Sequence, residues 1–148
     1  MDRAGGLKLL FVCTGNTCRS PMAEAIARAL LKKQGRDDVK VVSAGVGAFP
    51  GSPATPEACR AVRALGYEMH DHRSRPVTAE LLAEADVVYV MTQAHLERVK
   101  AIDPAVHAEL LDPEGQIADP IGQGQEVYDR TAAHLEELIR ARLDSVKV

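Results

Sequence analysis

A cysteine and an arginine six positions apart frame the part of this sequence whose residues could do chemistry. The stretch CTGNTCRS, Cys13 to Ser20, follows an apolar run and precedes residues with helical spacing. A tight loop between a strand and a helix points successive backbone N–H groups at an anion, and the helix dipole adds positive charge. Gly15 is expected to provide the backbone freedom that this curvature needs. The pattern predicts a phosphate-binding loop whose substrate contacts come from Thr14, Gly15, Asn16, Thr17, Cys18 and Ser20.

Side chains of this loop have the chemistry for phosphoryl transfer. The positive environment is expected to hold Cys13 as a thiolate, which is the attacking form. Arg19 presents a planar fork of donors that can hold two phosphoryl oxygens through the transition state, which lysine could not match geometrically. Ser20 could donate its hydroxyl to the sulfur when the sulfur becomes the leaving group. We expect Asn16 to brace the loop from within.

Attack by a thiolate also requires a proton for the leaving oxygen or nitrogen. The sequence has three Asp-Pro pairs, which begin at Asp103, Asp112 and Asp119. Such pairs often only open turns, and we interpret the first two in this way. Asp119 lies in the last loop before the final predicted helix, so we predict that it is the proton donor. The same carboxylate would take a proton from the water that hydrolyses the phosphocysteine.

Hydrophobic spacing predicts the elements that position these residues. Short apolar or β-branched runs predict strands at 7–12, 39–43, 87–91 and, more weakly, 107–111. Helices are predicted at 20–35, 56–66, 78–85, 92–102 and 126–146. We expect Ser20 to cap the first helix, with Pro21 in its first turn.

The alternation of strands and helices predicts the architecture. Right-handed βαβ units build a parallel sheet that is covered by helices on both faces. Ligands of such sheets bind beyond the carboxyl ends of the strands, where the Cys13 loop would lie. A chain of 148 residues without an evident linker is expected to form a single domain over residues 1–148.

Composition limits the partners and the compartment. The formal net charge of -3 provides no basic excess for nucleic-acid binding. Residues 1–6 contain no long apolar stretch, so we expect neither a signal peptide nor a membrane span. Three cysteines are too few for a secreted disulfide framework and favour a reducing compartment, the cytoplasm. No cysteine or carboxylate cluster accompanies His70 and His72, so we expect no metal site. We also expect no cofactor and a monomeric protein.

Three motifs together resemble the low-molecular-weight protein phosphatases. They are FVCTGNTCRSPMAEA from Phe11 to Ala25, SAG from Ser43 to Gly45, and the Asp-Pro pair at Asp119. The resemblance implies a three-layer α/β/α, flavodoxin-like fold with a four-stranded parallel sheet of order 2-1-3-4. It also implies metal-independent catalysis through a phosphocysteine, with phosphorylated proteins as substrates. By this resemblance Ser43 and His72 support the bracing network around Asn16.

The residue between the loop asparagine and the second cysteine separates two branches of this family. Members selective for phosphotyrosine usually have Ile or Leu there, with aromatic residues just after the Asp-Pro pair. This chain has Thr17 and the pattern CTGNTCRSPMAE, which resembles the protein arginine phosphatase branch. It departs from that branch at Ile121, where phenylalanine is expected. We predict phosphoarginine as the substrate, with phosphotyrosine as the alternative.

Other interpretations stay open at this point. Cys18 either traps oxidised Cys13 as a reversible disulfide, as the resemblance suggests, or is a small residue packed at the helix start. An arsenate reductase on the same scaffold would need further cysteines late in the chain, and only Cys59 lies outside the loop. A non-catalytic phosphate-binding module would need neither Cys13 nor Asp119.

Overall fold

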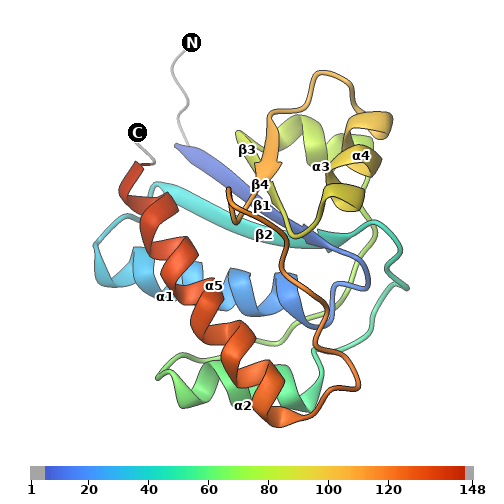
Figure 1. The fold of residues 1–148 in the computed structure, drawn as a ribbon. Helices are drawn as coiled ribbons and strands as arrows, with labels where there is room; N and C mark the ends of the chain where they lie inside the picture. Colours follow the sequence, from blue (N-terminus) through green and yellow to red (C-terminus); the bar gives the residue numbers. More distant parts are fainter. Residues whose placement is uncertain (1–5, 146–148) are drawn as a thin grey trace.

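The computed structural model describes residues 6–145 and consists of one sheet between two layers of helices (Figure 1). The strands are β1 (Leu7–Cys13), β2 (Val39–Gly45), β3 (Val87–Val90) and β4 (Ala108–Leu110). The helices are α1 (Arg19–Lys33), α2 (Pro56–Ala64), α3 (Ala79–Glu84), α4 (Gln93–Ile102) and α5 (Gln125–Ser145). Every predicted strand and helix is therefore present.

The four strands form a parallel sheet in the order β2-β1-β3-β4, which confirms the predicted topology and fold class. Strand β1 lies between β2 and β3, and its register pairs Cys13 with Gly45 and Val12 with Val90. The carboxyl ends of these three strands consequently meet at one edge of the sheet. The loops that follow them share this edge.

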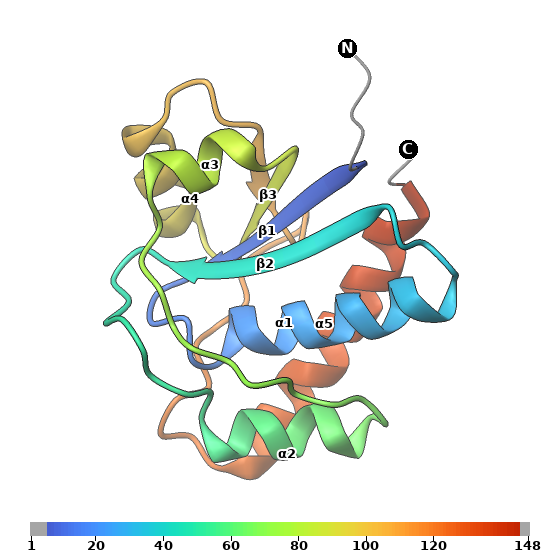
Figure 2. The ribbon, with the colours of Figure 1, turned by 180° about the vertical axis from the view of Figure 1, so that it is seen from behind.

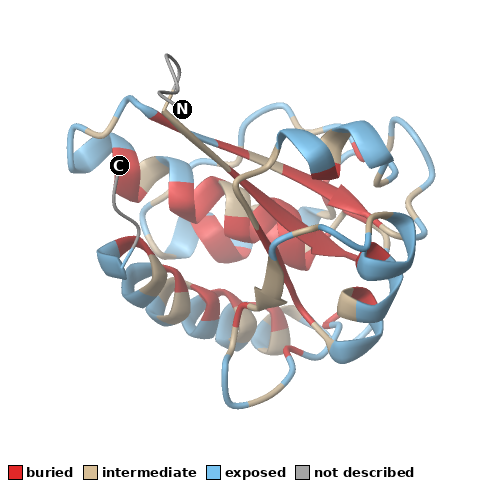
Figure 3. Ribbon diagram, turned by 90° about the horizontal axis from the view of Figure 1, so that it is seen from above, coloured by how far each residue is buried: buried red, intermediate tan, exposed pale blue. Residues whose placement is uncertain are grey.

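Two hydrophobic clusters cover the two faces of the sheet. Alternate residues of β1 point to opposite faces, so Leu9 and Phe11 belong to one cluster while Leu10 and Val12 belong to the other. The larger cluster packs β1 against α1, α2 and α5, and the smaller one packs the sheet against α3 and α4. Figure 2 shows these layers from behind, and Figure 3 shows that the strands are mostly buried.

The first helix begins differently from the prediction. Helix α1 starts at Arg19, and its cap residue Cys18 makes no side-chain capping bond. The expectation that Ser20 caps the helix is wrong, because the Ser20 hydroxyl is instead bonded to side chains of the loop. Pro21 does lie in the first turn. The predicted end of α5 at Val146 lies outside the described residues.

Two features are absent from residues 6–145. None of the helices there has the length and apolar character needed to cross a bilayer. The same residues contain no group of three or more His, Cys, Asp or Glu side chains that could hold a metal ion.

Candidate active site

The loop after β1 surrounds a small pocket at the carboxyl edge of the sheet. Its volume is about 210 Å³. The chain turns at Asn16, which has a φ of 59° and is the residue in the left-handed region, whereas Gly15 is not. The expectation for Gly15 is therefore corrected: the asparagine makes the turn, and Gly15 only lines the pocket. The lining residues are Cys13, Thr14, Gly15, Thr17, Cys18, Arg19, Asp119 and Ile121.

The end of strand β2 and the two residues after it support the loop from one side. The carbonyl groups of Cys13 and Thr14 accept hydrogen bonds from the backbone N–H groups of Val46 and Gly47, both at 2.9 Å. A Cβ atom on Gly45 would collide with the carbonyl oxygen of Thr14. The glycine of the SAG motif therefore permits a close approach between β2 and the loop.

A chain of hydrogen bonds leads from the sulfur of Cys13 into the protein. The Cys13 Sγ lies 2.9 Å from Ser20 Oγ, and Asn16 Nδ2 donates to both Ser20 Oγ at 2.8 Å and Ser43 Oγ at 3.0 Å. Ser43 in turn donates to Glu24 Oε1 at 2.6 Å. Because the amide of Asn16 donates to the Ser20 oxygen, the Ser20 hydrogen remains available for the sulfur.

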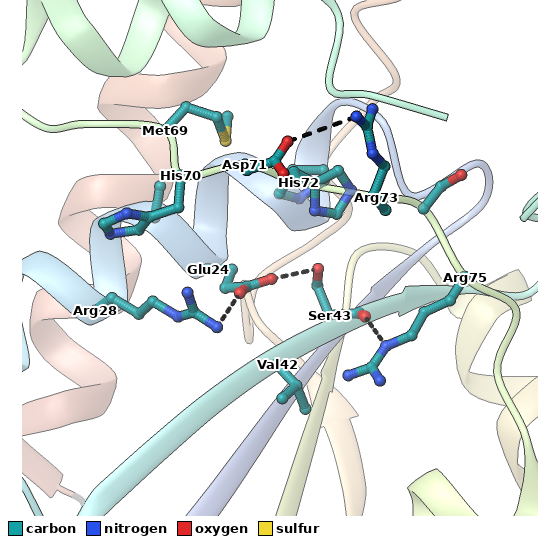
Figure 4. Close-up of a pocket in the computed structure, with 13 residues that line it drawn as sticks. Glu24, Arg28, Val42, Ser43, Met69, His70, Asp71, His72, Arg73 and Arg75 are labelled. Atoms are coloured by element: carbon teal, nitrogen blue, oxygen red, sulfur yellow. Dashed lines mark hydrogen bonds and ion pairs between the residues drawn. The ribbon is translucent and has the colours of Figure 1, made fainter. Parts of the chain in front are cut away.

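Glu24 is a member of this network that the motif did not identify. Its carboxylate accepts from Ser43 on one side and lies 2.6 Å from Arg28 on the other (Figure 4). A carboxylate can only accept, so it obliges Ser43 to donate to it and to accept from Asn16. Glu24 lies four residues after Ser20 on α1, and this helical spacing was the available signal.

Both oxygens of Asn16 are also bonded. Its backbone oxygen accepts from His72 Nε2 at 2.6 Å, and its side-chain oxygen accepts from the backbone N–H of Arg75 at 2.9 Å. Ser43 and His72 thus both contact Asn16, where the resemblance placed them. They lie in the wall of a second pocket, of about 380 Å³, behind the loop (Figure 4).

Arg19 is buried, although it is charged, with only 3% of its surface exposed. Its Nη1 donates to the carbonyl oxygen of Ile117 at 2.8 Å, and its Nη2 donates to Thr14 Oγ1 at 3.4 Å. Its Nε has no hydrogen-bond partner among the described residues. Leaving a buried donor unpaired costs free energy, and an oxyanion in the pocket would accept this hydrogen.

Only one of the three Asp-Pro pairs reaches the pocket. Asp119 Oδ2 lies 3.6 Å from Arg19 Nη2, while its Oδ1 accepts from the backbone N–H of Ile121 at 3.1 Å. Asp103 and Asp112 accept in the same way from a backbone N–H two residues later, as turn residues do, and Asp112 also lies 3.3 Å from His134 Nε2, but neither lines the pocket. The contact with Arg19 and the pocket therefore distinguishes Asp119 from the other two, whereas the turn bond does not.

Cys18 lies at the back of the pocket beside α5. It is buried, and its sulfur lies 3.2 Å from the hydroxyl of Tyr128. Burial and the hydrogen bond with Cys18 raise the pKa of Tyr128 to about 12, so the phenol keeps its proton at neutral pH. Cys13, Cys18 and Cys59 are all free thiols. The redox role of Cys18 stays a prediction.

His95 is a second residue that the sequence reasoning missed. Its Nε2 lies 2.8 Å from Thr14 Oγ1, although 81 residues separate the two. It is buried, and burial, followed by the nearby charge of Arg19, lowers its pKa to about 4, with Asp119 acting in the opposite direction. The available signal was its place three residues after Thr92, which caps α4.

The small pocket at the edge of the parallel sheet is lined by a thiol, a buried arginine and a carboxylate. This combination defines a cysteine-dependent phosphatase. Residues 8–148 match the family model described as low molecular weight phosphotyrosine protein phosphatase, and the chain belongs to this family.

Known relatives carry two kinds of names. A protein-arginine-phosphatase of Bacillus subtilis (strain 168) is 37% identical over 151 residues, covering 95% of this chain and 97% of the relative. A solved YwlE arginine phosphatase mutant with a phosphorylated active-site serine superposes with a TM-score of 0.89 at 36% identity, covering 94% and 95% of the two chains. A low molecular weight protein tyrosine phosphatase from T. tengcongensis superposes with a TM-score of 0.90 at 36% identity, covering 95% and 100%.

Proposed function

We propose that this phosphatase hydrolyses phosphoarginine on proteins through a phosphocysteine at Cys13. The observation that supports the substrate is the position of Thr17, which contributes to the wall of the pocket that holds Cys13 and Asp119. A threonine hydroxyl can bond a guanidinium nitrogen, whereas a phosphotyrosine ring would be better served by flat apolar walls. The relative from Bacillus subtilis is named for the same activity.

The proposed first step transfers the phosphoryl group to sulfur. The thiolate of Cys13 attacks phosphorus in line, the P–N bond of phosphoarginine breaks, and Asp119 donates a proton to the departing guanidine nitrogen. Arg19 is the clamp, because its unpartnered Nε–H and its Nη2 can bind two phosphoryl oxygens. The backbone N–H groups of the loop would bind the remaining negative charge.

The proposed second step returns the enzyme to its starting state. Asp119, now ionised, takes a proton from water as the water oxygen attacks phosphorus, and the P–S bond breaks. The leaving thiolate of Cys13 accepts a hydrogen bond from the hydroxyl of Ser20, which keeps its proton, lies 2.9 Å away and is oriented by Asn16. Inorganic phosphate then leaves, with the water proton on Asp119.

Side-by-side kinetics on phosphoarginine and phosphotyrosine peptides test the substrate assignment. Thr17→Val removes the hydroxyl at nearly constant volume, Thr17→Ile adds an apolar wall, and Thr17→Ser is the matched control that keeps the hydroxyl. We expect the ratio of kcat/KM for phosphoarginine to that for phosphotyrosine to fall roughly tenfold in the first two variants, the worth of about one hydrogen bond. Thr17→Ser should retain the ratio of the parent. A ratio that is the same in all four proteins would refute the assignment.

Trapping tests the covalent step independently of the substrate. Acid quenching during turnover, followed by mass spectrometry, should place the phosphoryl group on Cys13, and Cys13→Ala should show neither adduct nor turnover. An adduct on another residue would refute the nucleophile. A Cys13→Ala variant that turned over at the rate of the parent would favour the non-catalytic alternative for this loop.

We further propose that the chain is a cytoplasmic monomer with one domain over residues 1–148, acting on phosphorylated proteins and not on nucleic acid or membranes. Both hydrophobic clusters pack on the same sheet, which supports a single folding unit. The free thiols and the formal net charge of -3 agree with this compartment and these partners.

A further inference from the structure

His95 and Thr14 meet because of the sheet topology. Strands β1 and β3 are hydrogen-bonded neighbours, with Val12 opposite Val90, so the loops that follow them lie side by side. The first loop contains Thr14, and the second leads into α4, where His95 is the third residue. The distance of 2.8 Å between His95 Nε2 and Thr14 Oγ1 joins α4 to the phosphate loop.

The hydrogen-bond partners of His95 define its tautomer. The backbone N–H of Thr92 donates to His95 Nδ1 at 3.2 Å, so this nitrogen must be the acceptor of the ring. A neutral imidazole then carries its hydrogen on Nε2 and donates it to Thr14 Oγ1. The neutral form is the stable one near neutral pH, since burial and Arg19 lower the pKa of His95 and the opposing effect of Asp119 is smaller.

The same oxygen of Thr14 accepts a second hydrogen bond, from Arg19 Nη2 at 3.4 Å. Together with the bond from Nη1 to Ile117, it holds the guanidinium at two nitrogens. The side edge of the guanidinium is formed by Nε–H and the second hydrogen of Nη2. Asp119 Oδ2 lies near it, 3.6 Å from Nη2, which is longer than a hydrogen bond, so this edge can still bind an oxyanion. With both lone pairs of Thr14 Oγ1 occupied, its own hydrogen also remains to be donated, and Thr14 lines the pocket.

We propose that His95 is a positioning residue of this phosphatase. Through the hydroxyl of Thr14 it sets the guanidinium edge that Arg19 presents to the phosphoryl group. The inference rests on the proposed function only in taking the pocket to bind a phosphoryl group, and it does not depend on which phosphoresidue is the substrate.

A double-mutant cycle tests this role. His95→Leu removes the donor, Thr14→Val removes the acceptor, and the double variant removes both. We expect each single variant to weaken binding of inorganic phosphate and to lower kcat/KM for p-nitrophenyl phosphate by roughly 3- to 10-fold, as one lost hydrogen bond would. Because His95 acts through Thr14, the double variant should be no worse than Thr14→Val alone. Phosphate binding is measured by calorimetry and does not require turnover.

Two further variants separate positioning from helix capping. Thr92→Ala removes the side chain that caps α4 but leaves the contact between His95 and Thr14, so it should lower the melting temperature without changing phosphate affinity. His95→Gln keeps one donor and one acceptor and should restore part of the phosphate affinity that His95→Leu loses. Circular dichroism melting reports whether each variant is folded.

The outcomes are distinct. Losses in the two single variants that multiply in the double variant, or a phosphate affinity unchanged by His95→Leu, would overturn the inference and leave the proposed function standing. A parent that binds phosphate without any turnover would overturn the proposed function, and the binding cycle would still decide the role of His95. A parent that neither binds phosphate nor turns over would overturn both.

Discussion

Replacing Asn16 should destabilise the whole protein, because this residue both turns the loop and bonds it to three other segments. Its side chain donates to Ser20 and Ser43 and accepts from the backbone of Arg75, while its backbone has a φ of 59°. Asparagine tolerates this left-handed conformation better than most residues that have a Cβ atom. Glycine, which has none, adopts it without a steric cost. The variants Asn16→Ala and Asn16→Gly separate these two contributions.

The expected magnitudes follow from the contacts. Three hydrogen bonds at about 1 kcal/mol each amount to about 3 kcal/mol, which both variants lose. Alanine adds about 1 kcal/mol for the left-handed backbone, which gives a total of about 4 kcal/mol. Asn16→Gly avoids this last cost of about 1 kcal/mol. The greater freedom of glycine in the unfolded chain offsets part of that gain, so Asn16→Gly should be more stable than Asn16→Ala by less than about 1 kcal/mol. For a chain of this length the alanine variant should melt about 10 °C lower than the parent.

Urea denaturation at pH 7 and calorimetric melting measure these differences. Gln34→Ala is the control, because Gln34 is exposed after the end of α1 and its loss should change the free energy of unfolding by less than about 0.5 kcal/mol. A loss below about 1 kcal/mol in Asn16→Ala would refute the energetic importance of the network. An alanine variant more stable than the glycine variant would refute the backbone contribution.

Two further predictions concern stability. The lowered pKa of His95 means that acid favours the unfolded chain: between pH 6.5 and about 4 the unfolded imidazole binds a proton and the folded one does not, so on the order of 3 kcal/mol is lost as the pH falls through this range. His95→Gln should flatten that part of the pH profile in urea denaturation, and an unchanged profile would contradict the shift. Arg142→Met should cost about 2 kcal/mol, since Arg142 pairs with Glu109 and donates to two carbonyl groups at the end of β4, those of Leu110 and Leu111. Arg130→Met, which removes an exposed pair on α5, should cost under about 0.5 kcal/mol, and equal losses in these two variants would refute the distinction.

The elements could be predicted because their information is local. The apolar run before Cys13, the caps at Thr78 and Thr92, and the stop at Gly66 depend on residues within one or two turns of each other. The strand–helix alternation then restricts the sheet to parallel topologies. The start of α1 was the exception, because the Ser20 hydroxyl is bonded to Cys13 and Asn16 in the loop and does not cap the helix.

The loop from Cys13 to Ser20 could be singled out from the sequence, since its cysteine, arginine and asparagine are close along the chain and their chemistry is specific. Which partners orient these groups was decided only by the tertiary structure. Glu24 acts on the loop through Ser43 of β2, and His95 reaches Thr14 because β1 and β3 are neighbours in the sheet. A hydrogen bond requires its two heavy atoms to lie within a narrow range of distances. Residues 81 positions apart meet this condition only through the packing of strands and helices, which no local sequence pattern records.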